Sequence, residues 1–221
     1  MRIGITYNLK SDFFPAPNLS SPEDAAEEFD RSETIEAIRE VLANAGHEVF
    51  LLGGGIEAAS KIKECSIDFV FNLAEGLKGR SREAHIPALL ELMGVPYTGS
   101  DPLALALTLD KALTKRIAQS LKISTPEFRI LESWKDLDEV PGQLPLFVKP
   151  AWEGSSKGIR KSSCVRNRSE LAREVRRLFE DYPGVPILAE EYIPGQEITV
   201  GVLGNRPAAL LGMMEMAFRD S

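Results

Sequence analysis

Short apolar segments of strand type alternate with helical segments in the first hundred residues, and this alternation constrains the fold more than any other feature. Residues 3–5, 49–52 and 67–71 are apolar runs of strand type. Residues 30–45 and 56–64, which lie between them, have the pattern of helices. Strands that alternate with helices imply a parallel sheet covered by helices. The chain is therefore expected to begin with an α/β domain.

The first helix has a sequence signal at each end. Asp30 and Glu33 have the spacing of a capping box, which predicts a helix start at Asp30. The apolar residues at 35, 38, 41, 42 and 45 fall on one face of such a helix. Gly46 follows the last of them and is expected to end the helix.

Two loop regions of the first domain are expected to lie near a ligand. Residues 8–30 are rich in proline, serine and acidic side chains, and loops of this length inside a domain are often functional. Ligands of parallel sheets bind beyond the carboxyl ends of the strands. Those ends correspond here to residues 7–8 and 72–76.

The pattern changes after about residue 100. Turn residues crowd residues 95–102, so we place a domain boundary there, between a first domain at 1–100 and a second at 101–221. Helices are predicted at 83–93, 103–121 and 167–181, and strands at 128–131, 146–150, 187–192, 197–203 and 208–216. Strands that follow one another without helices predict an α+β domain with antiparallel strands.

Composition narrows the classes of function. The chain has 43% hydrophobic and 27% charged residues, as expected of a globular protein, and its net charge of -7 argues against a nucleic-acid partner. No apolar run is long enough to cross a membrane. Cys65 and Cys164 lack metal-type spacing and are expected to be reduced thiols of a cytoplasmic protein.

The most informative segment is 147–159, where a strand ends in Lys149 and a loop of small residues follows. The small loop residues are Gly154, Ser155, Ser156 and Gly158. They let backbone N–H and hydroxyl groups approach an anion closely, and Lys149 and Lys157 add positive charge. A polyphosphate needs this chemistry, although no Gly-Lys-Ser/Thr opens a helix as in a P-loop. Taken alone, the segment fits a hairpin turn with solvated lysines about equally well.

Two further segments suit a nucleotide, each with an ordinary alternative. Lys111 stands on a predicted helix, where a lysine is usually exposed to solvent. Residues 188–200 place acidic residues on both sides of a Pro-Gly turn. A carboxylate at a strand end can accept hydrogen bonds from a ribose hydroxyl or an adenine amino group. The alternative for this segment is a surface hairpin with ordinary acidic residues.

Together these motifs resemble those of the D-alanine–D-alanine ligases in order and spacing. They are Pro96-Tyr97-Thr98-Gly99-Ser100, Asp110-Lys111 with Thr114-Lys115, Val148-Lys149-Pro150 with Glu153-Gly154-Ser155-Ser156-x-Gly158, and Glu190 with Gly195-x-Glu197. The resemblance covers residues 71–203 and is specific as a set, although each motif is weak singly. It implies the ATP-grasp fold, with a Rossmann-like N-terminal domain followed by an α+β ATP-grasp central domain.

The resemblance also implies an activity and a role for individual residues. In the family, ATP phosphorylates a carboxylate, and an amine attacks the acyl phosphate to give an amide, ADP and phosphate. The residues implied to bind ATP are Lys111, Lys149, Glu153, Gly154, Ser155, Ser156 and Gly158 for the phosphates, and Glu190, Tyr192, Ile193 and Glu197 for adenine and ribose. Ser155 would also lie near the reacting centre and is a catalytic candidate.

The sequence departs from the family where the amino-acid substrate would bind. The family motif Glu-x-x-Val-Ser, which holds the first amino acid, is replaced by residues 26–30. Glu27 or Glu28 could substitute, and we select Glu27 as the second catalytic candidate. Glu75 stands where the family has a histidine, which changes the charge that the pocket accepts. The alternatives are a ligase for another acid and amine, or a nucleotide-binding fragment without catalysis.

The resemblance places the magnesium ligands of the family after Ser221, so we predict none among the 221 residues. These residues are expected to bind ATP but not to form the amide bond on their own. The implied partner is a small amino-acid-like molecule, with neither nucleic acid nor membrane, and assembly as a homodimer is considered.

Overall fold

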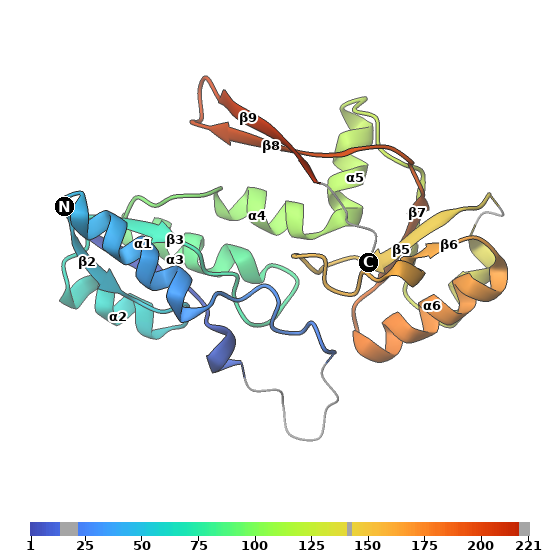
Figure 1. Cartoon of the computed structure of the whole chain (residues 1–221), viewed down its shortest axis with the longest axis horizontal. Helices are drawn as coiled ribbons and strands as arrows, with labels where there is room; N and C mark the ends of the chain where they lie inside the picture. Colours follow the sequence, from blue (N-terminus) through green and yellow to red (C-terminus); the bar gives the residue numbers. More distant parts are fainter. Residues whose placement is uncertain (14–21, 141–142, 217–221) are drawn as a thin grey trace. The chain divides into compact units, whose positions relative to one another are not determined.

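A computed structural model of the chain describes residues 1–13, 22–140 and 143–216. The chain divides into two compact units, one within residues 1–191 and the other from residue 192 onward (Figure 1). The first unit holds two β-sheets with their helices, and the second holds a β-hairpin. The predicted boundary near residue 100 lies within the first unit and stays a prediction.

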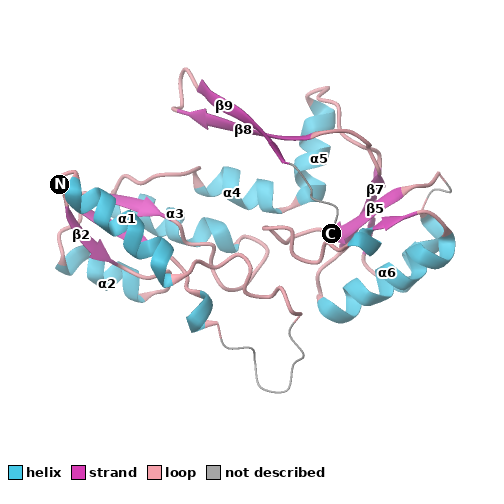
Figure 2. Cartoon of the chain, in the orientation of Figure 1, coloured by secondary structure: helices cyan, strands magenta, loops and turns pink. Residues whose placement is uncertain are grey.

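The first sheet is parallel, as predicted, and has the strand order β2-β1-β3. Its elements are β1 (Arg2–Thr6), α1 (Ser32–Asn44), β2 (Glu48–Leu51), α2 (Glu57–Glu64) and β3 (Phe69–Asn72). In the central strand, Ile3 pairs with Val49 on one side and Phe69 on the other. The helices connect successive strands (Figure 2), so the carboxyl ends of the three strands lie at one edge of the sheet.

Helix α1 begins later than predicted. The prediction of a capping box formed by Asp30 and Glu33 was wrong. Its N-cap is Arg31, whose side chain makes no capping hydrogen bond. Asp30 is held in extended conformation instead, because it forms a parallel bridge with Leu9. Its N–H donates to the carbonyl oxygen of Asn8 at 2.9 Å. This bridge ties the long first loop back to the end of β1.

The segment after β3 forms the 3-10 turn η2 (Arg82–Ala84) and helix α3 (His85–Met93). Gly94 ends α3 in the left-handed conformation, with φ 69°. The core of this region is a cluster of buried apolar side chains from the sheet and its helices. Its members are Leu52, Ala58, Ile62, Ile67, Val70, Ala74, Ile86 and Leu90.

The prediction of a single helix at 103–121 was wrong, because the helical conformation is interrupted at Asp110. Two helices form, α4 (Pro102–Leu109) and α5 (Lys111–Ser120). Asp110 has ψ 95°, outside the helical range, and its carboxylate accepts a hydrogen bond from the N–H of Leu113 at 2.9 Å. An aspartate side chain competes in this way with backbone hydrogen bonds and starts a new helix. The break places Lys111 at the first position of α5.

The second sheet of this unit is antiparallel, as predicted, with the order β4-β7-β5-β6. Its elements are β4 (Phe128–Leu131), β5 (Leu146–Pro150), β6 (Cys164–Val165), α6 (Arg168–Asp181) and β7 (Ile187–Glu191). Three short 3-10 segments complete the unit, namely η1 (Lys10–Asp12), η3 (Trp134–Glu139) and η4 (Lys161–Ser163). Phe128 and Phe147 flank Glu190 across the sheet, so Glu190 lies on the strand between β4 and β5.

The second unit contains the hairpin of β8 (Glu197–Leu203) and β9 (Ala209–Met216). The two strands are antiparallel, with a bulge between Gly201 and Val202. These strands were predicted at nearly the same residues. No helix among the described residues is long and apolar enough to cross a membrane.

Helix α6 packs on the antiparallel sheet and forms the second core. Asn167 caps its start by accepting a hydrogen bond from the N–H of Glu170 at 2.9 Å. The buried residues of this core are Leu131, Val140, Leu146, Val148, Val165, Leu171, Val175, Leu178, Tyr182, Ile187 and Ala189. Burial of these side chains fixes the sheet that presents Lys149 and Glu190.

Truncation of a side chain through which α6 packs on the antiparallel sheet should destabilise the fold. Leu178 is fully buried, so Leu178→Ala should lower the free energy of unfolding by about 2–5 kcal/mol through lost burial and the cavity left behind. Urea denaturation followed by circular dichroism measures this change. Leu121→Ala is the control, since Leu121 is exposed. Equal stability of the two variants would contradict the packing described for α6.

Candidate functional site

Lysine side chains gather around one buried glutamate on the antiparallel sheet. Glu190 accepts from Lys149 at 2.5 Å and from Lys115 at 2.7 Å. Burial raises the pKa of Glu190, but hydrogen bonds and charge from the two lysines outweigh burial and lower it overall. Glu190 is therefore a carboxylate that balances only one of the two ammonium charges. This cluster brings together Lys149 and Glu190, which the sequence selected separately.

Lys111 lies at the same site without an acidic partner of its own. Its ammonium group donates to the backbone carbonyl oxygen of Glu153, and it forms no salt bridge with any residue that the structure describes. Burial lowers the pKa of Lys111, and the charge of Lys149 lowers it further. Two ammonium groups therefore repel each other beside the loop. An anion placed between them would relieve that repulsion.

The loop that follows β5 makes a tight turn at its two serines. The N–H of Lys157 donates to the carbonyl oxygen of Gly154 at 2.9 Å, which closes the turn. Ser155 has φ 45° and Ser156 has φ 60°, a conformation that non-glycine residues adopt at an energetic cost. Both serines are exposed, and their N–H groups have no partner among the described residues. The tip of the loop thus offers free donors to a ligand.

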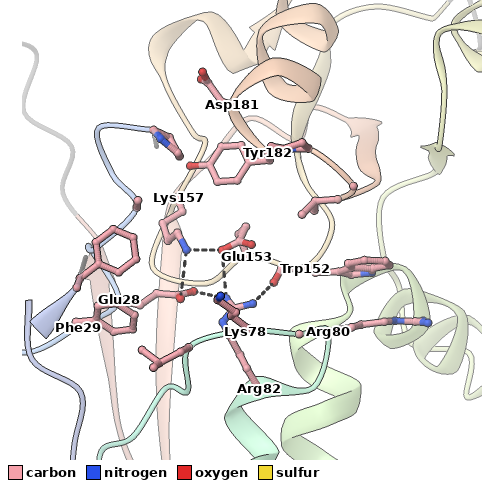
Figure 3. A pocket seen from close by; sticks show the side chains of 18 residues that line it. Glu28, Phe29, Lys78, Arg80, Arg82, Trp152, Glu153, Lys157, Asp181 and Tyr182 are labelled. Atoms are coloured by element: carbon pink, nitrogen blue, oxygen red, sulfur yellow. Dashed lines mark hydrogen bonds and ion pairs between the residues drawn. The ribbon is translucent and has the colours of Figure 1, made fainter. Parts of the chain in front are cut away.

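A buried ionic network, which we call the loop-base network, holds the start of this loop; it consists of Glu28, Arg82, Glu153 and Lys157. Arg82 binds the carboxylates of Glu28 at 2.7 Å and Glu153 at 3.2 Å. Lys157 binds the same two carboxylates, at 3.4 Å and 2.5 Å. Arg82 also donates to the carbonyl oxygen of Trp152 at 3.0 Å. These side chains converge at one wall of a cavity of about 380 Å³ (Figure 3).

Of the two neighbouring glutamates, Glu28 reaches the loop, whereas Glu27, which the sequence selected, does not. The N–H of Gly154 donates to Glu28 at 2.7 Å, and the Glu28 side chain is only 1% exposed. Glu27 instead pairs with Lys10 at 2.9 Å, with 57% of its side chain exposed. The two neighbours point to different sides of a turn, and Arg82 draws only Glu28 inward. A catalytic role for either glutamate stays a prediction.

A second cavity, of about 280 Å³, lies at the carboxyl ends of the parallel strands, where the sequence predicted a ligand. Its lining includes the carboxylates of Glu28, Asp30, Glu75 and Glu83. Burial raises the pKa of Glu75, and the charges of Glu83 and Glu28 raise it further, to about 7. Glu75 is therefore partly protonated near neutral pH.

Several residues of this site were missed in the sequence. Lys115 carried a signal, because it stands four residues after Lys111 and so lies on the same face of a helix. Arg82 carried none, since its partners Glu28 and Glu153 lie 54 and 71 residues away. Only the folded chain brings them together.

Three of the residues predicted to bind ATP belong to the second unit. Tyr192, Ile193 and Glu197 belong to the second unit, where Glu197 is the first residue of β8. Their contacts with adenine and ribose stay predictions. Within the described part of the chain, no group of three or more histidine, cysteine, aspartate or glutamate residues could hold a metal ion. The described donors therefore do not fit a magnesium site on their own.

A solved structure defines the class of fold. The chain is similar to the D-alanine–D-alanine ligase from Bacillus anthracis complexed with ATP, with a TM-score of 0.66 and 25% sequence identity. The match covers 98% of this chain and 66% of that chain. The chain therefore has the ATP-grasp fold.

Sequence comparisons show which proteins the chain resembles. Residues 119–221 match the family model described as D-ala D-ala ligase C-terminus. The D-alanine–D-alanine ligase of Bordetella petrii is 35% identical over 176 residues, which is 79% of this chain and 52% of that protein. The protein y4sG of Sinorhizobium fredii is 35% identical over 192 residues, or 81% and 54%. The chain is thus similar to D-alanine–D-alanine ligases, and it spans about half the length of the curated relatives it matches.

The raised pKa of Glu75 should make stability depend on pH. Between its ordinary value of 4.5 and about 7, the folded state holds this proton and the unfolded state does not, so stability falls as pH rises. Glu75→Gln cannot ionise, and its melting temperature should exceed that of the wild type increasingly from about pH 5 to about pH 8. Scanning fluorimetry across this range tests it, with the exposed Glu132→Gln as control. A difference that does not change with pH would contradict the raised pKa.

Proposed function

We propose that this chain forms the nucleotide-binding part of an ATP-dependent carboxylate–amine ligase that makes an amide bond through an acyl phosphate. The observation that carries the proposal is the position of Lys111. This ammonium group is largely buried, faces Lys149, and lacks a salt bridge within the described residues. Such a group needs an anion, and the loop tip beside it offers free N–H donors.

The charge balance of the site favours a polyphosphate over a single carboxylate. Lys111, Lys115 and Lys149 bring three positive charges, and Glu190 returns one negative charge. The carboxylate of Glu153 also acts on Lys111, but it is paired with Arg82 and Lys157, so two positive charges of the lysines remain for the ligand. The phosphates of ATP carry enough negative charge to neutralise them, and fixed ammonium groups and N–H donors are the usual means of stabilising a transferred phosphoryl group.

In this proposal, the residues of the chain have separate roles in catalysis. Lys111 and Lys149 bind and orient the phosphates, and the loop from Glu153 to Gly158 covers them. ATP, when bound, supplies the phosphoryl group that activates the substrate carboxylate. Ser155, at the tip of the loop, lies where the activated carboxylate would be held. Positioning of this kind accounts for much of the rate in phosphoryl transfer.

The contacts with the adenosine part of ATP are proposed from the family resemblance. Glu190 would accept from the adenine amino group, while the backbone of Tyr192 and Ile193 would meet the ring edge and Glu197 the ribose. Lys115 supports this role because it keeps Glu190 ionised and oriented. Magnesium binding is likewise proposed from the resemblance.

The wider organisation is proposed on the same basis. The parallel β2-β1-β3 sheet would be a Rossmann-like N-terminal domain within residues 1–100, and 101–221 would belong to the ATP-grasp domain. The partner would be a small amino-acid-like molecule. Cytoplasmic location and a homodimer stay predictions.

One observation favours a ligase for an acid and amine other than D-alanine. The cavity at the parallel sheet is lined by four carboxylates, and Glu75 stands where the family has a histidine. A pocket of this charge would attract an additional ammonium group on the substrate. Calorimetric binding of amino acids with and without a second amine, measured in the presence of ATP, would show which of the two substrate classes the pocket accepts.

Loss of a lysine should weaken nucleotide binding. Lys149→Ala should reduce ATP affinity by about 1–3 kcal/mol, because a charged hydrogen bond in a partly buried site is lost. Lys111→Ala should act similarly and leaves both salt bridges of Glu190 in place. Isothermal titration calorimetry measures both, with the exposed Lys135→Ala as control. Unchanged affinity in both lysine variants, with a wild type that binds ATP, would refute the phosphate site.

The loop tip should become ordered when ATP binds. Ser155 and Ser156 are exposed and lack backbone partners among the described residues, so their amides should exchange quickly in the free protein. We expect slower hydrogen exchange of residues 154–158 with ATP. Residues 169–180 of α6 serve as the internal control. Equal protection of the loop in both states would show that the loop does not close on phosphates.

A further inference from the structure

The far end of the phosphate loop is fixed by an aspartate from a distant part of the chain. Asp24 accepts a hydrogen bond from the N–H of Gly158 at 2.7 Å, across 134 residues of sequence. Its other oxygen accepts from the hydroxyl group of Tyr182 at 2.5 Å. One carboxylate thus joins the first long loop, the end of the phosphate loop and the end of α6.

Gly158 is held from three directions at this point. Besides the bond to Asp24, its carbonyl oxygen accepts from Arg177 at 2.7 Å. Its φ is 77°, and a Cβ atom there would lie 2.5 Å from Pro150 and 3.1 Å from Tyr182. Gly158 is also buried. Residue 158 is therefore a fixed point, in contrast to the exposed serines two and three residues earlier.

Asp24 itself is anchored by groups that keep it ionised. Burial raises the pKa of Asp24, but the hydrogen bonds from Tyr182 and Gly158 lower it, and the charge of Arg160 lowers it further, so the net direction is downward. Tyr182 is buried in the core that α6 forms with the antiparallel sheet. Asp24 therefore links the end of the loop to that rigid core.

We propose that Asp24 is a positioning residue for nucleotide binding: through Gly158 and Tyr182 it fixes the far end of the phosphate loop, so that the N–H groups at Ser155 and Ser156 are presented to the ligand. The inference rests on the proposed function of the loop. Asp24 does not touch the nucleotide. Its loss therefore reduces the contribution of the phosphates to binding and leaves that of adenosine unchanged.

Calorimetry on the full chain with ATP and with adenosine tests the proposal. Asp24→Ala should weaken ATP binding about tenfold, which corresponds to the loss of one or two hydrogen bonds that order the loop. Asp24→Asn should restore most of the affinity, because its amide oxygen still accepts from Gly158. Tyr182→Phe removes only the hydroxyl group from the buried ring and should have an intermediate effect. The neighbouring exposed Glu23→Ala is the matched control.

Hydrogen exchange without nucleotide tests the anchor independently of ATP. Asp24→Ala should speed exchange at Gly158 and leave α6 unchanged. Wild-type ATP affinity together with unchanged exchange at Gly158 would overturn the proposal, as would an equal loss of ATP and adenosine binding. If the wild type binds no ATP, the proposed function fails, whereas faster exchange at Gly158 would still establish Asp24 as the anchor.

Discussion

The buried contact between Arg82 and Glu28 is the interaction on which the site depends. Both side chains are almost inaccessible, at 7% and 1% exposed, so each charge needs the other. Loss of one partner from a buried pair typically costs about 3–5 kcal/mol, because the remaining charge is left unpaired. Arg82 also binds Glu153 and the carbonyl oxygen of Trp152, so the same contact fixes the start of the loop.

The loop-base network and Asp24 hold the two ends of one short loop. Glu28 accepts from Gly154, and Asp24 accepts from Gly158, so the segment around residues 24–28 fixes both ends. The serines between them keep free N–H groups and a strained backbone. Anchored ends and a free tip let a loop close on a ligand without losing its place in the fold.

The lysine cluster on the antiparallel sheet provides the charge that such a loop would cover. Glu190 lies on the strand between β4 and β5 and binds two lysines. Lys111 is the first residue of α5, which starts where Asp110 interrupts the helical segment. Its ammonium group donates to the backbone carbonyl oxygen of Glu153 in the loop.

The sequence by itself determined most of the elements, the two kinds of sheet and the resemblance to the D-alanine–D-alanine ligases, because periodicity, turn residues and motif order are local properties of the chain. It also indicated Lys111, Lys149 and the glycine-serine loop. Only the tertiary structure placed Glu28 rather than Glu27 at the loop, and only it joined Arg82 and Asp24 to the loop. These contacts span 54 to 134 residues, and burial and charge pairing across that distance leave no local pattern.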